Sequence, residues 1–230
     1  MATSEVPGRA AGTQTLARGL RALELIANSP GGLTIQDLAD SLGVHRSIAT
    51  RLVATIADFH LVSRGPDGRY RPAGGLTALA RQVYTGMRDV AKPVMQDLAN
   101  RLGSSVALFV EEGQDAVAVT VAEPSGAAVR VAYREGARHP LDRGAAGYAL
   151  LAALPARRGE DPRVAEARRV GYATSFGEIV SGYWGLGVPL RRSDAEPASC
   201  LTLISASKEV VDTSVVAMVA AAADLGRLLD

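Results

Sequence analysis

Hydrophobic residues between Ser41 and Val62 recur at the three- and four-residue spacing of an amphipathic helix. Five apolar residues share one side of this helix: Ile48, Ala49, Leu52, Val53 and Ile56. The opposite side carries two guanidinium groups, three hydroxyl groups and no carboxylate, from Arg46, Ser47, Thr50, Arg51 and Thr55. Such a face suits a groove that is lined by phosphates and has base edges at its floor. An ordinary amphipathic surface helix is the alternative.

Two further helices are predicted before this one. The apolar spacing from Thr15 to Ser29 indicates a helix that the following Pro-Gly-Gly stops. Thr34 opens a second helix, with Asp37 placed three residues later as in a capping box, and Gly43 ends it. Two short helices joined by a tight turn that contains glycine are typical of a helix-turn-helix.

A β-hairpin is predicted directly after the helix-turn-helix. Residues 61–64 and 69–71 form two extended runs around a Gly-Pro-Asp-Gly turn. Arg64, Arg69 and Arg71 flank the loop, so the hairpin resembles the wing of a winged helix, which can reach the DNA backbone or the minor groove. A solvated sheet edge without a partner is the alternative.

Residues 76–102 are predicted to be helical throughout, with Pro93 as a kink or a fresh helix start. Apolar residues recur along this helix, among them Leu76, Leu79, Val83 and Met87. The pattern is consistent with a stiff linker that forms a dimer contact, and equally with an internal packing helix.

The hydrophobic period changes to two after Ser104, which predicts strands at 104–112, 116–124 and 128–136. A helix of small residues follows at 144–155, a second helix at 161–173, two strands at 182–191 and 198–207, and a C-terminal helix at 210–229. Antiparallel strands with helices packed around them define an α+β domain.

Composition and charge narrow the class of protein only slightly. The 230 residues have a net charge of +1, 47% hydrophobic and 21% charged residues, which are values of an ordinary globular protein. Residues 1–75 carry eight arginines against six acids, an excess too small to indicate nucleic-acid binding by itself. One cysteine allows no intrachain disulfide, and the chain has neither an apolar run of spanning length nor a signal peptide. We therefore expect a cytoplasmic protein with no membrane segment.

No catalytic residues, metal site or cofactor are predicted. The chain lacks a Gly-x-Ser-x-Gly elbow, a P-loop and a Rossmann glycine motif. The three histidines, His45, His60 and His139, fall in different elements, and a single cysteine cannot build a thiolate zinc site. Cys200 lies in a predicted core strand, where a buried small residue is the favoured interpretation over a nucleophile or redox sensor.

Arg143 is the sharpest candidate for ligand binding in the second half of the chain. It precedes a cluster of small residues, where its guanidinium could clamp a ligand carboxylate at two points. A surface arginine paired with Asp142 or Glu178 is the alternative.

The order of these motifs over residues 15–205 resembles the IclR family of bacterial transcriptional regulators. The N-terminal likeness lies in Leu33-Thr34, Leu38-Ala39, Leu42-Gly43, Ser47, Arg51-Leu52 and Thr55-Ile56. The C-terminal likeness lies in the segments 139–155, 168–182, 185–191 and 200–207. The resemblance implies a winged helix, a linker helix and a GAF-like effector domain, in members that dimerise, often pair into tetramers and repress or activate catabolic operons.

The resemblance also implies an effector pocket between the sheet and the small-residue helix. Carried over residue by residue, the pocket comprises Ala145, Ala146, Ser175, Gly185, Thr202 and Ile204 or Ser205, to which we add Arg143.

The chain departs from the family pattern at several positions. Ser175 and Gly185 stand where members that bind small keto acids carry Asp and Cys, so the ligand of those members does not transfer. Arg143 stands where a small residue is common and Tyr148 where Lys is common. The segment between Pro155 and Arg168 has room for little more than one helix instead of two, which predicts a more open pocket mouth.

We predict a disordered lead at residues 1–13, a winged helix-turn-helix at 14–75, a linker helix at 76–92 and a GAF-like effector-binding domain at 93–230. The predicted DNA contacts are Arg46, Ser47, Thr50, Arg51, Arg64, Arg69 and Arg71; the predicted ligand contacts are Arg143, Ala145, Ala146, Ser175, Gly185, Thr202 and Ser205. The predicted function is a ligand-responsive repressor or activator that binds double-stranded operator DNA and a small effector, such as a carboxylate. We expect a homodimer or homotetramer. A small-molecule enzyme and a protein-interaction adaptor remain alternatives.

Overall fold

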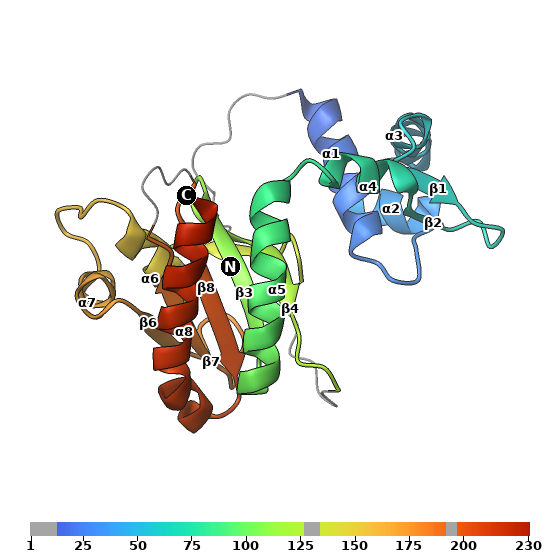
Figure 1. Cartoon of the computed structure of the whole chain (residues 1–230). Helices are drawn as coiled ribbons and strands as arrows, with labels where there is room; N and C mark the ends of the chain where they lie inside the picture. Colours follow the sequence, from blue (N-terminus) through green and yellow to red (C-terminus); the bar gives the residue numbers. More distant parts are fainter. Residues whose placement is uncertain (1–12, 127–133, 192–196) are drawn as a thin grey trace. The chain divides into compact units, whose positions relative to one another are not determined.

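The computed structural model describes residues 13–126, 134–191 and 197–230 (Figure 1). The predicted lead at 1–13, apart from Thr13, and most of the predicted strand at 128–136 lie outside these residues. The chain divides into two compact units, Met1–Val83 and Tyr84–Asp230.

The N-terminal unit is a three-helix core with a hairpin. Its elements are α1 (Gln14–Ala27), α2 (Ile35–Leu42), α3 (Arg46–Asp58), β1 (Val62–Arg64), β2 (Tyr70–Pro72) and α4 (Gly74–Ala80). The predicted capping box is present, because the Thr34 side chain accepts from the Asp37 amide at 3.2 Å and Asp37 accepts from the Thr34 amide at 2.9 Å. Gly43 ends α2 in the left-handed conformation. Ile26, Leu38 and Val53, one from each helix, are fully buried together, and this core fixes the helix-turn-helix.

The predicted uninterrupted helix over 76–102 is wrong. α4 ends at Ala80, and α5 (Thr85–Leu102) begins only after Tyr84, which has a φ of 50°. The Tyr84 hydroxyl donates to Glu112 at 3.0 Å, and its ring packs against Val110, Val117 and Val119. These contacts hold Tyr84 outside both helices, so tertiary packing prevails over the local helical period. Pro93 lies inside α5 and does not end it.

The C-terminal unit is built on a six-stranded antiparallel sheet in the order β5-β4-β3-β8-β7-β6. The strands are β3 (Ser105–Glu112), β4 (Asp115–Ala122), β5 (Arg138–Pro140), β6 (Ala173–Phe176), β7 (Trp184–Pro189) and β8 (Ser199–Ser205), and the helices that follow α5 are α6 (Gly144–Ala153), α7 (Pro162–Val170) and α8 (Lys208–Leu229). The fold class, helices around an antiparallel sheet after an N-terminal helix-turn-helix, is as predicted. β5 and β6 were missed because each is only three or four residues long.

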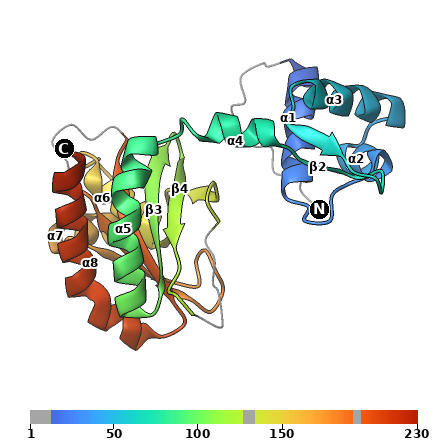
Figure 2. The same ribbon diagram turned by 45° about the vertical axis from the view of Figure 1, so that its right-hand side comes forward.

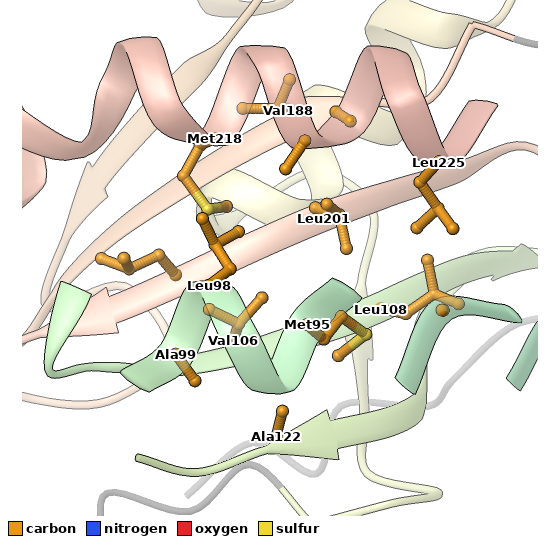
Figure 3. Packing of buried hydrophobic residues seen from close by; sticks show 14 of the residues in the cluster. Met95, Leu98, Ala99, Val106, Leu108, Ala122, Val188, Leu201, Met218 and Leu225 are labelled. Carbon is orange, nitrogen blue, oxygen red and sulfur yellow. The ribbon is translucent and has the colours of Figure 1, made fainter. Parts of the chain in front are cut away.

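Helices cover both faces of this sheet. α5 and α8 lie side by side on one face, and α6 lies on the other (Figures 1 and 2). The α5–α8 side holds the main apolar core, in which Met95, Leu98, Val106, Leu201 and Met218 interdigitate (Figure 3). Successive side chains of a strand point to opposite faces of the sheet. The residues of β3, β7 and β8 that alternate with this core therefore point to the α6 side, where a smaller core contains Ala146, Ala149 and Cys200.

In the parts of the chain whose structure is described, no helix combines the length and the apolarity that a membrane span needs.

Candidate functional site

The outer face of α3 is polar and accessible. Arg46, Ser47, Thr50, Arg51 and Thr55 are all exposed, as predicted, and Ala49, Leu52, Val53 and Ile56 are buried. The expectation that Ile48 joins the buried side is wrong: it is 39% exposed. Ile48 lies at the edge of the apolar stripe, next to Ser47 in sequence, so α3 presents one apolar side chain beside its polar face.

Local hydrogen bonds order the first turn of α3. His45 is the N-cap, and its ring nitrogen Nδ1 accepts from the Ser47 amide at 3.4 Å and lies 2.9 Å from the Ser47 hydroxyl. The Thr50 hydroxyl donates to the Arg46 carbonyl at 2.9 Å. Both hydroxyl oxygens are held at fixed positions along the exposed face, where they can accept further bonds.

The arginines of the N-terminal unit fall into two groups. Among the residues that the structure describes, the guanidinium groups of Arg46, Arg51 and Arg64 make no ion pair or hydrogen bond. Arg69 instead donates to the Gly32 carbonyl at 3.0 Å and lies 3.6 Å from the Asp37 carboxylate. The free arginines remain available to an anionic partner, whereas Arg69 is engaged within the fold.

Arg71 is engaged even more firmly. Its two terminal nitrogens donate to the Asp67 carboxylate at 2.9 and 2.6 Å, and Nη2 also donates to the Gly31 carbonyl at 3.0 Å. The Arg71 guanidinium holds the pKa of Asp67 well below its usual range. Arg69 and Arg71 therefore fasten the hairpin to the loop before α2, and Arg64 is the hairpin arginine that points free of such contacts.

The second cluster lies where α6 begins. Gly187 on β7 lets α6 approach the sheet so closely that a Cβ there would lie 2.2 Å from the Ala145 carbonyl oxygen. A Cβ at Gly185 would lie 3.1 Å from the Ser175 hydroxyl and 3.2 Å from the Ala145 Cβ. The structure thus brings together Ala145, Ser175 and Gly185, as the family resemblance implies, although they are far apart along the chain.

Side chains of the chain itself occupy the first amides of α6. The Ala145 amide donates to the Ser175 hydroxyl at 2.9 Å, and the Gly144 amide donates to Glu178 Oε2 at 2.8 Å. Both amides lie at the positive end of the helix dipole, which favours negative charge. A carboxylate therefore already sits at the N-terminus of α6.

Two further side chains, from Tyr148 and Arg163, bind the Glu178 carboxylate. The Tyr148 hydroxyl donates to Oε2 at 2.6 Å, and Arg163 Nη1 lies 3.2 Å from Oε1. The Arg163 guanidinium stacks over the Tyr148 ring at 4.4 Å from its centroid, and Asp161 pairs with the same arginine at 2.7 Å. Burial, together with the bond to Glu178, raises the pKa of Tyr148 to about 12, so its hydroxyl keeps the proton that it donates.

Arg143 precedes this helix but points to solvent. Its side chain is 54% exposed, and Nε lies 3.4 Å from the Asp142 carboxylate. This geometry matches the alternative of a surface arginine paired with Asp142, and its role in ligand binding remains a prediction. The neighbouring His139 ring is buried, which lowers its pKa, and its Nε2 has no hydrogen-bond partner among the described residues.

The remaining predicted ligand residues are spread over two sides of the sheet. Thr202 is buried one strand away from Gly187 and donates to the Ala107 carbonyl at 3.3 Å, and Ala146 accepts from Cys200 at 3.6 Å. Ser205 has the parity of Leu201 and Leu203, which face α5 and α8, so it belongs to the other side. Of the two possibilities left by the sequence, Ile204, which pairs with Gly185, lies on the α6 side.

Cys200 lies on β8 and is fully buried. Burial raises the pKa of the Cys200 thiol well above its usual value, and no group of three His, Cys, Asp or Glu side chains among the described positions could hold a metal ion.

Glu178 and Arg163 are the important residues that sequence reasoning did not assign to the site. The sequence suggests Glu178 only as an alternative partner for Arg143 and as part of the matched segment 168–182, and it suggests no role for Arg163. Glu178 follows Ser175 by three residues within the segment 168–182 that resembles the family, and this position was the available signal. Glu178 is 34 residues away from Gly144 along the chain, so their hydrogen bond could not be predicted from the sequence.

Comparison with known proteins agrees with this architecture. The helix-turn-helix domain of IclR matches residues 15–66, and the C-terminal domain of bacterial transcriptional regulators of the IclR type matches residues 82–162. The chain is 33% identical over 159 residues to the HTH-type transcriptional regulator Rv1719 of Mycobacterium tuberculosis, covering 69% of this chain and 61% of that protein. It is 33% identical over 149 residues to the regulator TtgV of Pseudomonas putida, covering 64% of this chain and 57% of that protein. The matches thus span about three fifths of these relatives' lengths.

Solved structures show the same fold. An IclR transcriptional regulator from Alicyclobacillus acidocaldarius superposes with a TM-score of 0.76 at 22% identity, over 95% of this chain and all of that one. An IclR homologue of Microbacterium hydrocarbonoxydans gives a TM-score of 0.78 at 24% identity, over 94% of this chain and 99% of that one. The chain belongs to the IclR family of bacterial transcriptional regulators.

Proposed function

We propose that the chain is a DNA-binding regulator of transcription, acting in the cytoplasm, whose C-terminal unit binds a small effector. The observation that carries the proposal is the acid-free face of α3, on which Arg46 and Arg51 are exposed and unpaired within the described structure. Arginine reads guanine in the major groove through two hydrogen bonds, and the hydroxyls of Ser47 and Thr50 suit phosphate or base edges. Family membership supports the same function.

The hairpin extends this proposed DNA interface. We expect Arg64, whose guanidinium is unpaired among the described residues, to contact a phosphate. Arg69 and Arg71 bind the carbonyls of Gly32 and Gly31, so they stabilise the hairpin in the free protein, and their DNA contacts remain predictions. Whether a bound regulator represses or activates transcription depends on where its operator lies relative to the promoter.

A homodimer or homotetramer fits the N-terminal unit. Leu16 and Leu20 on α1 are 63% and 55% exposed, and Leu79 on α4 is 63% exposed. Large exposed apolar side chains on the helices of one unit are typical of a surface that another subunit covers.

Salt dependence tests the DNA-binding proposal against the adaptor alternative. The full chain is used to select bound duplexes from a randomised 30-base-pair library, and the affinity for an enriched duplex is then measured by fluorescence anisotropy at increasing salt. Release of phosphate counterions predicts a linear fall of log K with log salt, with a slope of about −0.9 per phosphate contact. Failure to enrich any duplex, or a flat salt response, contradicts the proposal.

Effector binding is proposed at the start of α6, beside Ala145, Ser175 and Gly185. The neighbouring structure from Microbacterium hydrocarbonoxydans is a complex with 4-hydroxybenzoate, which supports a small organic acid as the type of ligand. An acid that reaches the Gly144 and Ala145 amides must compete with Glu178 and Ser175, which already occupy them. This competition predicts modest affinity for acids smaller than the Glu178 side chain.

A thermal-shift screen of aromatic acids, keto acids and related catabolites, repeated with Arg143→Ala, tests the predicted clamp. If Arg143 binds the carboxylate, its removal should reduce the thermal shift caused by the acids. The melting temperature of the free protein should change little, because the side chain is 54% exposed and its one ion pair among the described residues is with the exposed Asp142. Arg101→Ala, which removes an exposed arginine paired with Asp97, is the control. Acids that shift both variants equally would refute the clamp.

A further inference from the structure

We propose that the C-terminal unit has a second ligand site, between α6, α7 and the loop that joins them, which binds an organic acid with an apolar or aromatic body. The site is a cavity of about 310 Å³, which lies at the lower end of the range for small-molecule sites. None of its lining residues belongs to the Ala145, Ser175 and Gly185 cluster. The inference deepens the effector function proposed above and rests on it only for the regulatory consequence, not for binding.

The floor of the cavity is apolar. The Tyr148 ring, Leu151 and Leu154 from α6 and its end, Pro155 from the loop and Val164 from α7 supply it. Tyr148 and Val164 are each 1% exposed, so they belong to the core and present one side to the cavity. Such walls favour a flat or branched hydrocarbon group.

The loop that forms the opposite wall is fixed in place by Arg168. The Arg168 guanidinium donates to the carbonyls of Leu151 and Leu154 at 3.1 and 3.2 Å, and it pairs with the Glu160 carboxylate. These contacts join both ends of the loop to α7 behind the cavity. The cavity is therefore formed before a ligand enters, which lowers the entropic cost of binding.

The charges at the rim select an anion. Asp142, Glu160 and Asp161 line the cavity, but each already has an arginine partner: Arg143, Arg168 and Arg163, respectively. Arg157 and Arg158 also line it, and neither guanidinium forms an ion pair or hydrogen bond within the described residues. Two uncompensated cations beside an apolar floor match a carboxylate attached to a hydrophobic body.

Tyr148 connects this cavity to the start of α6. Its ring forms a wall of the cavity, and its hydroxyl holds Glu178, which in turn accepts from the Gly144 amide. A ligand that moves the Tyr148 ring must change the hydrogen bond between the Tyr148 hydroxyl and Glu178. Occupation of the cavity would thus alter the competition at the other effector site, and each ligand would affect the affinity for the other by the same factor.

Binding is tested by calorimetric titration of the full chain, without DNA, with 3-phenylpropanoate and with its uncharged analogue 3-phenylpropan-1-ol. The acid should bind the wild type, and Arg157→Gln/Arg158→Gln should weaken it at least tenfold while leaving the alcohol unchanged. Arg169→Gln, which removes an α7 arginine that does not line the cavity, is the control and should bind the acid as the wild type does.

Protection mapping on the unmodified protein locates the acid. Phenylglyoxal modifies accessible arginines, and bound 3-phenylpropanoate should protect Arg157 and Arg158 and leave Arg143 reactive. Protection of Arg143 alone, equal affinity in the double variant, or absence of binding at millimolar acid each overturns the second site. Because no DNA is present, these outcomes are independent of whether the selected duplex binds.

Discussion

Simultaneous replacement of Arg46 and Arg51 by Ala is expected to weaken binding to the selected duplex by at least about 30-fold. A base-reading arginine contributes about 1–3 kcal/mol, and the two proposed readers lie on one exposed helix face. Loss of Arg51 alone should also relax base preference at one position of the site, because its two-point contact with a guanine would disappear. The fold should be unaffected, since neither guanidinium forms a hydrogen bond or ion pair with a described residue.

Fluorescence anisotropy with the enriched duplex and with a scrambled duplex measures both effects. The control removes two other exposed helical arginines, Arg21 and Arg101, each paired with a carboxylate of its own helix. It changes net charge equally and should reduce affinity only slightly. If the Arg46/Arg51 variant binds as tightly as the control, α3 is not the reading helix.

Short-range features of this fold were predictable from sequence. The Thr34 and Asp37 capping box, the Gly43 terminus and the Asp-Gly hairpin depend on residues within a few positions of one another, and all three are present. The polar face of α3 was predictable for the same reason, because helical geometry alone places its side chains. Only Ile48, at the boundary of the two faces, was assigned to the wrong side.

Long-range contacts explain the features that the sequence did not reveal. The interruption before α5 depends on Tyr84 meeting Glu112, and the occupation of the α6 amides depends on Glu178 meeting Gly144. The choice between Ile204 and Ser205 required the strand register, because a shift of one residue reverses the face. The resemblance to a family supplied the grouping of Ala145, Ser175 and Gly185 but not the side chains that fill the site.

Replacement of Gly187 by Ala is expected to destabilise the C-terminal unit by about 2–4 kcal/mol, a lowering of its melting temperature by roughly 5–15 °C. The added Cβ would lie 2.2 Å from the Ala145 carbonyl oxygen, which is backbone and cannot rotate away. Either α6 lifts from the sheet or β7 bends. Gly185→Ala should cost less, since its Cβ meets the Ser175 hydroxyl and the Ala145 Cβ at more than 3 Å.

The matched control for this prediction is Gly86→Ala in the first turn of α5. A Cβ at Gly86 meets nothing within 4 Å, so the substitution should leave stability unchanged or raise it by up to about 1 kcal/mol through helix propensity. Calorimetric unfolding of the three variants gives the order of stability. Equal melting of the Gly187 and Gly86 variants would show that α6 does not rest on β7 as closely as described. The Ala145 amide also donates a hydrogen bond to the Ser175 hydroxyl, so lifting α6 should reduce effector binding before the unit unfolds. A thermal-shift titration of the Gly187 variant with effector separates this loss of binding from the loss of stability.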